Sequence, residues 1–98
     1  MATVRLTARA FAHLEQIFEF IAEKDAARAL KTIQRIREAV LILEHHPLIG
    51  RPVEDGRREL IVSRGNAAHV VLYRWLPKDE TVLVLAVRDA RQAGYLPE

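Results

Sequence analysis

The sequence predicts a single α+β domain in which a two-helix antiparallel hairpin packs against an antiparallel β-sheet. Apolar residues recur every three or four positions in the first half of the chain and alternate with polar residues in the second half, which are the periods of helices and strands. The chain has 98 residues, of which 50% are hydrophobic, enough for one hydrophobic core. No internal repeat or long linker divides it. We therefore expect residues 1–98 to form one domain with the order strand, helix, helix and three strands.

The chain is expected to begin with a short strand and a helix. Alternating apolar and polar residues predict a strand over residues 2–6. Thr7 is a suitable N-cap for a helix over residues 8–24, because its hydroxyl can accept a hydrogen bond from a free backbone N–H of the first turn. The apolar residues of this helix are expected to face the core as one stripe, formed by Phe11, Leu14, Ile17, Phe18 and Ile21.

A second helix is expected over residues 26–45, with Asp25 as its N-cap and Pro47 shortly after its end. Its main apolar seam consists of Ala29, Ile33, Ile36, Val40 and Leu43. Leu30 and Leu41 lie off this seam, so the helix is apolar over more of its circumference than its own core requires. We expect a partner protein to cover Leu30 and Leu41.

The second half of the chain is predicted to be a loop followed by a three-stranded antiparallel meander. Glycine and proline residues mark residues 47–56 as the loop. Sequence alternation predicts strands over residues 58–63, 69–76 and 81–89, joined by turns at residues 64–66 and 77–80. The last two strands are apolar on both faces and should be central in the sheet. One face meets the helices, and the other needs a cover from the C-terminal segment or from a second protein.

Composition excludes several classes of protein. The chain has no cysteine, so it can form neither a disulfide nor a thiolate site. The N-terminus lacks the apolar run of a signal peptide, and no apolar stretch is long enough to span a membrane. We therefore expect a cytoplasmic protein without membrane contact. The net charge of +2 and the pI of 9.4 permit nucleic acid as a partner without requiring it.

The sequence contains none of the common motifs for metal, nucleotide or nucleophilic chemistry. Its 4 histidines do not have the spacing of metal ligands, so we expect neither a metal ion nor another cofactor. No glycine-rich phosphate loop is present, and the single serine, Ser63, does not lie in a nucleophile-elbow motif. Candidate chemistry is therefore confined to the arginine-rich second half.

The arginines of the second half allow two interpretations. In the functional one, several of them bind a phosphodiester while His69, Glu59 or Tyr95 moves protons during attack by an RNA 2′-hydroxyl, without a metal ion. In the structural one, arginines at strand ends form ion pairs with nearby acidic residues, as would apply to Arg58, Arg74 and Arg88. Both interpretations are compatible with the sequence.

Taken in order, five local motifs resemble the RelE/ParE superfamily of bacterial toxins over nearly the whole chain. They are Thr7-x-x-Ala10-x-x-x-Leu14-x-x-Ile17-x-x-Phe20-Ile21-Ala22, Pro47-x-Ile49-Gly50-Arg51-Pro52, Arg58-Glu59-Leu60, Val71-Leu72-Tyr73-Arg74 and Val87-Arg88-x-x-Arg91-Gln92. The resemblance implies the β-α-α-β-β-β fold and the role of toxin in a type II toxin–antitoxin system. It also implies a cognate antitoxin whose disordered tail folds across the toxin, with a homodimer or a heterotetramer with antitoxin as further assemblies.

The superfamily contains toxins with two kinds of target on nearly the same fold. ParE-like toxins bind DNA gyrase, whereas RelE-like toxins cut messenger RNA on the ribosome. RelE-type ribonucleases place basic residues where this chain has Glu59, Ile61 and Val70, and Asp89 stands where some relatives have a histidine. The negative group of Asp89 would oppose a phosphate at that position. The resemblance therefore favours the ParE-like branch, a gyrase-binding inhibitor of growth.

Two alternatives remain beside gyrase binding. A metal-independent messenger RNA endonuclease would use a reduced catalytic site of Arg88, Arg91 and Tyr95. A non-toxic structural relative would use its arginines only in surface ion pairs. For binding of RNA or of another target, the candidate residues are Arg58, Arg64 and Arg74.

Overall fold

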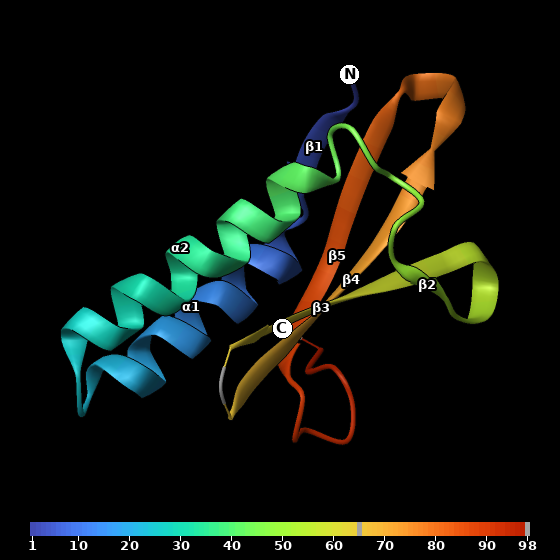
Figure 1. Ribbon diagram of the computed structural model, residues 1–98. Coiled ribbons are helices and arrows are strands. Elements are labelled where there is room, and N and C mark those ends of the chain that lie inside the picture. The colour runs from blue at the N-terminus through green and yellow to red at the C-terminus, as the bar shows by residue number, and fades with distance from the viewer. Residues whose placement is uncertain (65, 98) are drawn as a thin grey trace.

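The computed structural model describes residues 1–64 and 66–97, without the side chain of Arg64. Two helices lie on one face of a five-stranded sheet (Figure 1). The elements are β1 (Thr3–Leu6), α1 (Ala8–Ala22), α2 (Ala26–Ile42), β2 (Arg51–Pro52), β3 (Arg57–Arg64), β4 (Ala67–Leu76) and β5 (Thr81–Asp89), with short 3-10 turns at Glu54–Gly56 and Pro77–Asp79. The predicted α+β class is confirmed.

The sheet has the strand order β1-β5-β4-β3-β2. Strands β3, β4 and β5 form the predicted antiparallel meander, and β4 and β5 occupy central positions. The N-terminal strand β1 joins the sheet beside β5 and runs parallel to it. A parallel pairing requires a long crossover, and the helix hairpin together with the meander provides this connection.

Three predicted boundaries are wrong. The loop over residues 47–56 contains the short edge strand β2, because Arg51 and Pro52 pair with the start of β3. Helix α1 ends at Ala22 and α2 at Ile42, before the predicted ends at residues 24 and 45. After Ile42 the backbone N–H groups of three residues bond to carbonyls three positions back, so the chain tightens into 3-10 geometry and leaves the α-helix.

Both predicted helix caps are present. The Thr7 hydroxyl accepts a hydrogen bond from the backbone N–H of Ala10 at 3.1 Å, and the Asp25 carboxylate accepts one from the N–H of Arg28 at 3.0 Å. Each cap satisfies one of the backbone donors that an α-helix leaves free in its first turn. The two caps therefore fix where the helices of the hairpin begin.

The core lies between the hairpin and the meander. Its buried members include Ala10, Ile36, Val40, Leu43, Val62, Val71, Tyr73, Val82, Val84 and Val87. The expectation that Phe11 faces this core is wrong, since Phe11 is 57% exposed. Ala10 and His13 take the central positions of α1, because a small side chain at residue 10 lets the helix approach β5 closely.

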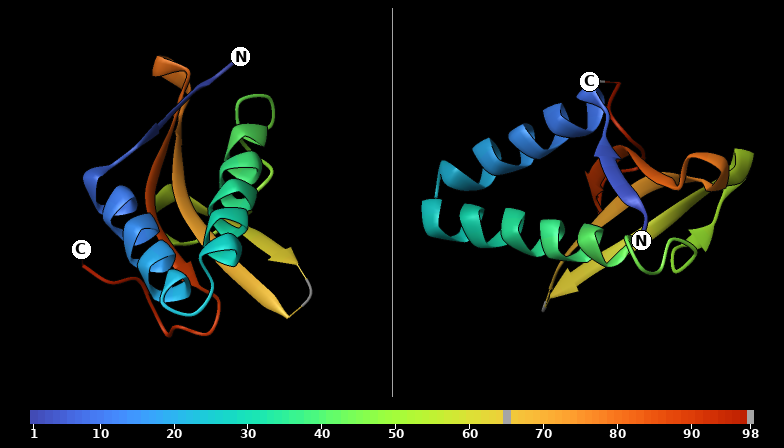
Figure 2. Two further views of the ribbon diagram at one scale, coloured as in Figure 1. Left: turned by 90° about the vertical axis from the view of Figure 1, so that its left-hand side faces the viewer. Right: turned by 90° about the horizontal axis from the view of Figure 1, so that it is seen from above.

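The second face of the sheet is covered by the chain's own C-terminal segment, residues 90–97. Val70, Leu72 and Ala86 alternate with the core residues of β4 and β5, yet they are buried as well. The Tyr95 hydroxyl donates to Glu59 on β3 at 2.7 Å. The segment then reaches α1, where the Leu96 carbonyl accepts hydrogen bonds from Arg9 and His13 (Figure 2).

The loop between α2 and β2 is held by the buried Tyr73. Its hydroxyl donates to the Pro47 carbonyl and accepts from the Gly50 N–H, both at 2.8 Å. Arg58 donates to the carbonyls of Leu48 and Gly50. The backbone of residues 47–50 is therefore fixed.

In the described part of the chain, no helix is long and apolar enough to cross a bilayer.

Replacing Gly50 with alanine is expected to destabilise the fold by about 1–3 kcal/mol, the usual range for overpacking. An added Cβ would lie 2.6 Å from the Tyr73 hydroxyl and 2.9 Å from the Glu59 carbonyl oxygen. Urea denaturation would measure the loss. Gly94→Ala is the matched control, because a Cβ at that position meets nothing within 4 Å. Equal stability of the two variants would contradict the packing of Tyr73 described above.

Candidate functional site

Glu59 is the centre of a polar cluster on the face of the sheet opposite the helices. Its side chain is buried, and one carboxylate oxygen accepts a hydrogen bond from Arg51 at 2.8 Å. The other accepts from the Tyr95 hydroxyl at 2.7 Å and lies 4.0 Å from the guanidinium of Arg88. Three elements therefore meet at one carboxylate: the edge strand β2, the end of β5 and the C-terminal segment.

This environment shifts the pKa values of both acidic groups. Burial alone would raise the pKa of Glu59, but the hydrogen bonds from Tyr95 and Arg51 and the nearby arginine charges outweigh burial and lower it. The pKa of Tyr95 is raised, first by burial and then by its hydrogen bond to Glu59. Glu59 is therefore ionised and Tyr95 protonated, so the hydrogen bond between them is charge-assisted.

Arg88 supports the turn that follows β5. One of its terminal nitrogens, Nη1, donates to the backbone carbonyls of Asp89, Ala90 and Gln92 at 3.3, 3.3 and 2.9 Å. Its guanidinium also stacks over the Tyr95 ring, 5.2 Å from the ring centre. Arg88 is thus committed to the C-terminal segment of its own chain.

Arg91 does not join this cluster. It is exposed and donates to both carboxylate oxygens of Asp89 at 3.1 Å. Hydrogen bonding from Arg91 lowers the pKa of Asp89. Of the three residues of the hypothetical ribonuclease site, Arg88 and Tyr95 are therefore in contact, while Arg91 pairs with the acidic residue that stands at the histidine position of some relatives.

Of the three arginines expected to bind a target, Arg58 and Arg74 lie on opposite faces of the sheet. Arg58 lies opposite the buried Tyr73 and bonds to the loop carbonyls, whereas Arg74 follows Tyr73 and lies on the other face. Arg74 stands directly across from Arg57 on β3. The side chain of Arg64 lies outside the described residues. Arg58 and Arg74 thus act in separate environments.

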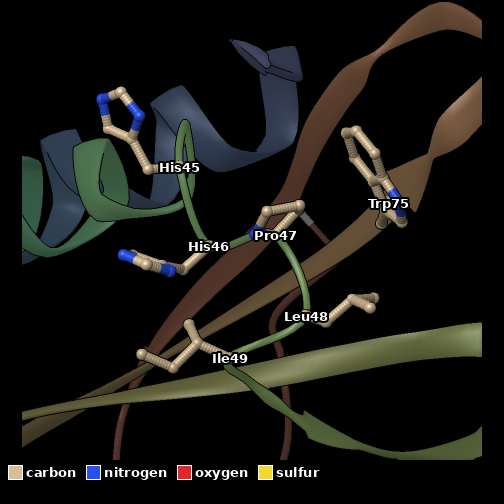
Figure 3. Close-up of a pocket in the computed structure, with 6 residues that line it drawn as sticks. All are labelled: His45, His46, Pro47, Leu48, Ile49 and Trp75. Carbon is tan, nitrogen blue, oxygen red and sulfur yellow. The ribbon is translucent and has the colours of Figure 1, made fainter. Parts of the chain in front are cut away.

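A second feature is an apolar hollow of 580 Å³ where the loop after α2 meets Trp75. Figure 3 shows Pro47 and Leu48 between the two histidines of the loop and Trp75. The exposed side chains of Leu48 and Ile49 stand on the backbone that Tyr73 and Arg58 hold. Apolar side chains on a fixed loop form a preorganised contact surface.

The outer face of α2 is a third candidate surface. Leu30 is 56% and Leu41 is 41% exposed, which agrees with their position off the core seam. The same helix carries four cationic residues, Arg28, Lys31, Arg35 and Arg37, and one acidic residue, Glu38. Within the described residues, none of these cations forms an ion pair. By helical spacing Arg37 lies beside Leu30 and Leu41, so the outer face is apolar and carries a positive charge.

The chain matches a family of known proteins over residues 4–94, described as the ParE toxin of the type II toxin–antitoxin system parDE. The chain belongs to the ParE toxin family. It is accordingly the toxin of a type II toxin–antitoxin system, as the resemblance of its motifs to the RelE/ParE superfamily predicts. A comparison with curated protein sequences found no match.

Solved structures agree with the family. The chromosomal ParDE system from P. aeruginosa is 26% identical, with a TM-score of 0.75 over 91% of this chain and 96% of the other. The RelBE2 toxin–antitoxin complex from Mycobacterium tuberculosis is 24% identical, with a TM-score of 0.64 over 90% and 96%. The intact E. coli RelBE complex is 9% identical, with a TM-score of 0.68 over 94% and 100%. The two RelBE structures show the shared fold alone.

Sequence reasoning missed two organising residues of this ParE family member. His13 is buried in α1, accepts from the Val87 N–H and contacts the Leu96 carbonyl. In the sequence Tyr73 stands only as part of a motif, yet in the fold its hydroxyl holds the loop of residues 47–50. A histidine within an apolar stripe and a tyrosine in a central strand indicate that a buried polar group needs a hydrogen-bond partner. The sequence does not identify these partners, because they lie 74 and 26 residues away.

Replacing Glu59 with glutamine is expected to lower the free energy of unfolding by about 2 kcal/mol at pH 7, since the partly buried Arg88 and Tyr95 lose a charged partner. The pKa of Glu59 lies below its ordinary value of 4.5 in the fold. Its contribution is therefore complete above that pH and is lost as the pH falls through the folded pKa. Urea denaturation at pH 7 and pH 3.5 should show a smaller acid dependence for Glu59→Gln than for the unmodified protein.

Asp55→Asn serves as the control, because Asp55 is exposed and lies 3.8 Å from its partner Arg57. Exposed pairs of this kind contribute little. A variant Glu59→Gln as stable as Asp55→Asn at pH 7 would contradict the central role of Glu59.

Proposed function

We propose that this toxin inhibits growth by binding DNA gyrase and that a cognate antitoxin neutralises it. The observation that carries the choice of gyrase over RNA is the closed cluster around Glu59. Metal-free RNA cleavage requires a proton acceptor near the 2′-hydroxyl and cations facing the phosphate. Here Arg88 is held by Glu59 and by backbone carbonyls of the same chain, the Tyr95 phenol is bound to Glu59, and Arg91 is paired with Asp89.

Electrostatics also favour a protein target. An RNA phosphate approaching Arg88 would meet the carboxylate of Glu59, 4.0 Å from the guanidinium, and would be repelled by it. The first-strand and second-strand positions that are basic in RelE-type ribonucleases are Glu59, Ile61 and Val70 in this chain. The membership in the ParE family supports the same choice. Gyrase works in the cytoplasm, which is also the compartment that the composition predicts.

The antitoxin is proposed to cover the outer face of α2. The similar structures from P. aeruginosa, M. tuberculosis and E. coli are described as toxin–antitoxin systems or complexes, which supports a polypeptide partner. Leu30 and Leu41 offer apolar contacts on this face, and Arg37 beside them, which forms no ion pair with a described residue, suits an acidic side chain of the antitoxin. This surface is distinct from the Glu59 cluster, which lies on the opposite side of the sheet.

Expression of the toxin without its antitoxin is expected to arrest growth, and the purified protein is expected to inhibit DNA supercoiling by gyrase while leaving RNA intact. Arg91→Ala should retain this inhibition, because among the described residues the hydrogen bonds of the Arg91 side chain go to Asp89 alone. A supercoiling assay beside gel analysis of cellular RNA would measure both activities. Cleaved transcripts that disappear in Arg91→Ala would establish the ribonuclease alternative, and normal growth with folded toxin would establish the non-toxic one.

Leu30→Asp and Leu41→Asp are expected to weaken antitoxin binding at least tenfold without unfolding the toxin, because both leucines are partly exposed. Isothermal titration calorimetry would give the affinity, and thermal denaturation would report the fold. Phe20→Asp on α1 is the matched control, since Phe20 is exposed but lies on the other helix. Unchanged affinity in both leucine variants would show that the antitoxin binds to another surface of the toxin.

A further inference from the structure

The loop after α2 and the single tryptophan of the chain form an apolar groove at one end of the molecule. The hollow of 580 Å³ between them is lined by His45, His46, Pro47, Leu48, Ile49 and Trp75 (Figure 3). A neighbouring hollow of 330 Å³ shares three of these walls, His45, Pro47 and Trp75, and continues to Pro77 in the turn after β4. Because they have these walls in common, the two hollows form one groove, the Trp75 groove.

Trp75 is only partly buried because its strand extends past its neighbour. The ladder between β3 and β4 ends with the pair Arg57 and Arg74. Strand β4 continues past this pair through Trp75 to Leu76. On its other side, Trp75 pairs with Val82 of β5. The β3 side of the strand is therefore open at Trp75.

The apolar wall of the groove stands on a fixed support. The backbone of residues 47–50 is bonded to the Tyr73 hydroxyl and to the guanidinium of Arg58. On this backbone, Leu48 is 58% and Ile49 is 56% exposed. A fixed apolar surface beside an aromatic ring suits an apolar side chain of a partner, because little ordering is needed on binding.

Two carboxylates belong to the second hollow. Glu44 and Glu80 both line it, and their backbone carbonyls accept hydrogen bonds from the N–H groups of Ala2 and Thr3 at 2.8 and 2.9 Å (Figure 1). Neither carboxylate forms an ion pair with a described residue, and neither does the amine of Met1, which lines the same hollow. No described arginine or lysine lines the groove. The groove is therefore acidic as well as apolar.

We propose that the Trp75 groove binds a segment of the toxin's target polypeptide in which a leucine-like side chain stands beside an arginine or lysine. The apolar side chain packs against Leu48 and Trp75, and its basic neighbour reaches Glu44 and Glu80. A guanidinium can also stack on the face of the indole ring. The proposal rests on the protein target of the proposed function, and it names the surface that contacts this target.

Charge favours the target over the antitoxin and over RNA. The outer face of α2 carries Arg37 beside Leu30 and Leu41 and suits an acidic antitoxin segment. The two carboxylates of the Trp75 groove would repel the same segment, and they would repel the phosphates of RNA. The groove contains no residue of α2, which ends at Ile42. The two surfaces therefore differ both in residues and in charge.

The single tryptophan makes the groove its own reporter. Trp75 fluorescence of the full-length toxin is titrated with a capped peptide of alternating leucine and arginine. In two control peptides, glutamine replaces the arginines or glycine replaces the leucines. The leucine–arginine peptide is expected to change the fluorescence saturably and to bind at least fivefold more tightly than either control, because it alone supplies both apolar and basic groups.

Variants of the toxin test the acidic end of the groove. The double substitution Glu44→Gln and Glu80→Gln is expected to weaken binding of the leucine–arginine peptide at least fivefold. It keeps the backbone bonds to β1, and thermal denaturation reports the fold. The matched control is the double substitution Glu19→Gln and Glu23→Gln, which removes the same charge from exposed positions of the α1 region outside the groove. This control should change the affinity less than twofold.

The same two double variants enter the supercoiling assay with gyrase. The variant of Glu44 and Glu80 is expected to require at least fivefold more toxin than the variant of Glu19 and Glu23 for the same inhibition. This assay decides whether the groove contacts the target, whereas the peptide titration decides which chemistry the groove binds.

Three results would overturn the proposal. One is equal binding of the leucine–arginine peptide and of either control peptide. Another is an equal loss of affinity in the two double variants. The third is undiminished inhibition of gyrase by the folded variant of Glu44 and Glu80. Failure of the proposed function shows separately, as absence of inhibition by the unmodified toxin, and the peptide titration does not depend on gyrase.

Discussion

Strand β5 is central in the sheet, yet β1 pairs with it only over residues 81–84. The remaining outer edge of β5 would leave buried backbone groups without partners, which is energetically unfavourable. Helix α1 and its cap supply them, because the Thr7 hydroxyl donates to the Leu85 carbonyl at 3.1 Å and the His13 Nδ1 accepts from the Val87 N–H at 3.0 Å. The edge of β5 therefore determines where α1 lies.

The same interaction orients the C-terminal segment. Because His13 Nδ1 accepts a hydrogen bond, Nε2 carries the proton of the neutral ring and donates to the Leu96 carbonyl at 2.8 Å. The residue before Leu96 is Tyr95, which reaches across the second face of the sheet to Glu59. The hydrogen bond that His13 forms with the edge of β5 thus also positions Leu96, and with it Tyr95 in the Glu59 cluster on the other face of the sheet.

The sequence was sufficient for the fold class, both helix caps and the meander, because each depends on local periodicity or on a residue within three positions of its partner. The sequence did not predict that Phe11 is exposed. Periodicity places Phe11 and Ala10 next to each other on the surface of α1, and the close approach of the helix to β5 is what buries Ala10 and leaves Phe11 outside. The candidate residues Glu59, Arg88 and Tyr95 were recognised singly. Their contact depends on the turn after β5, which brings together residues 36 positions apart and has no local signature.

The Glu59 cluster also bears on which of the two proposed kinds of target this fold can serve. Loss of the Glu59 charge alone would leave Arg51 and Arg88 without their acid, which would make this face attractive to a phosphate. This face of the sheet would still lack a proton acceptor for RNA cleavage, because Tyr95 is protonated and Arg88 is bonded to backbone carbonyls. An RNA-cleaving surface therefore requires new basic side chains and a released C-terminal segment at once, whereas a protein-binding toxin needs neither.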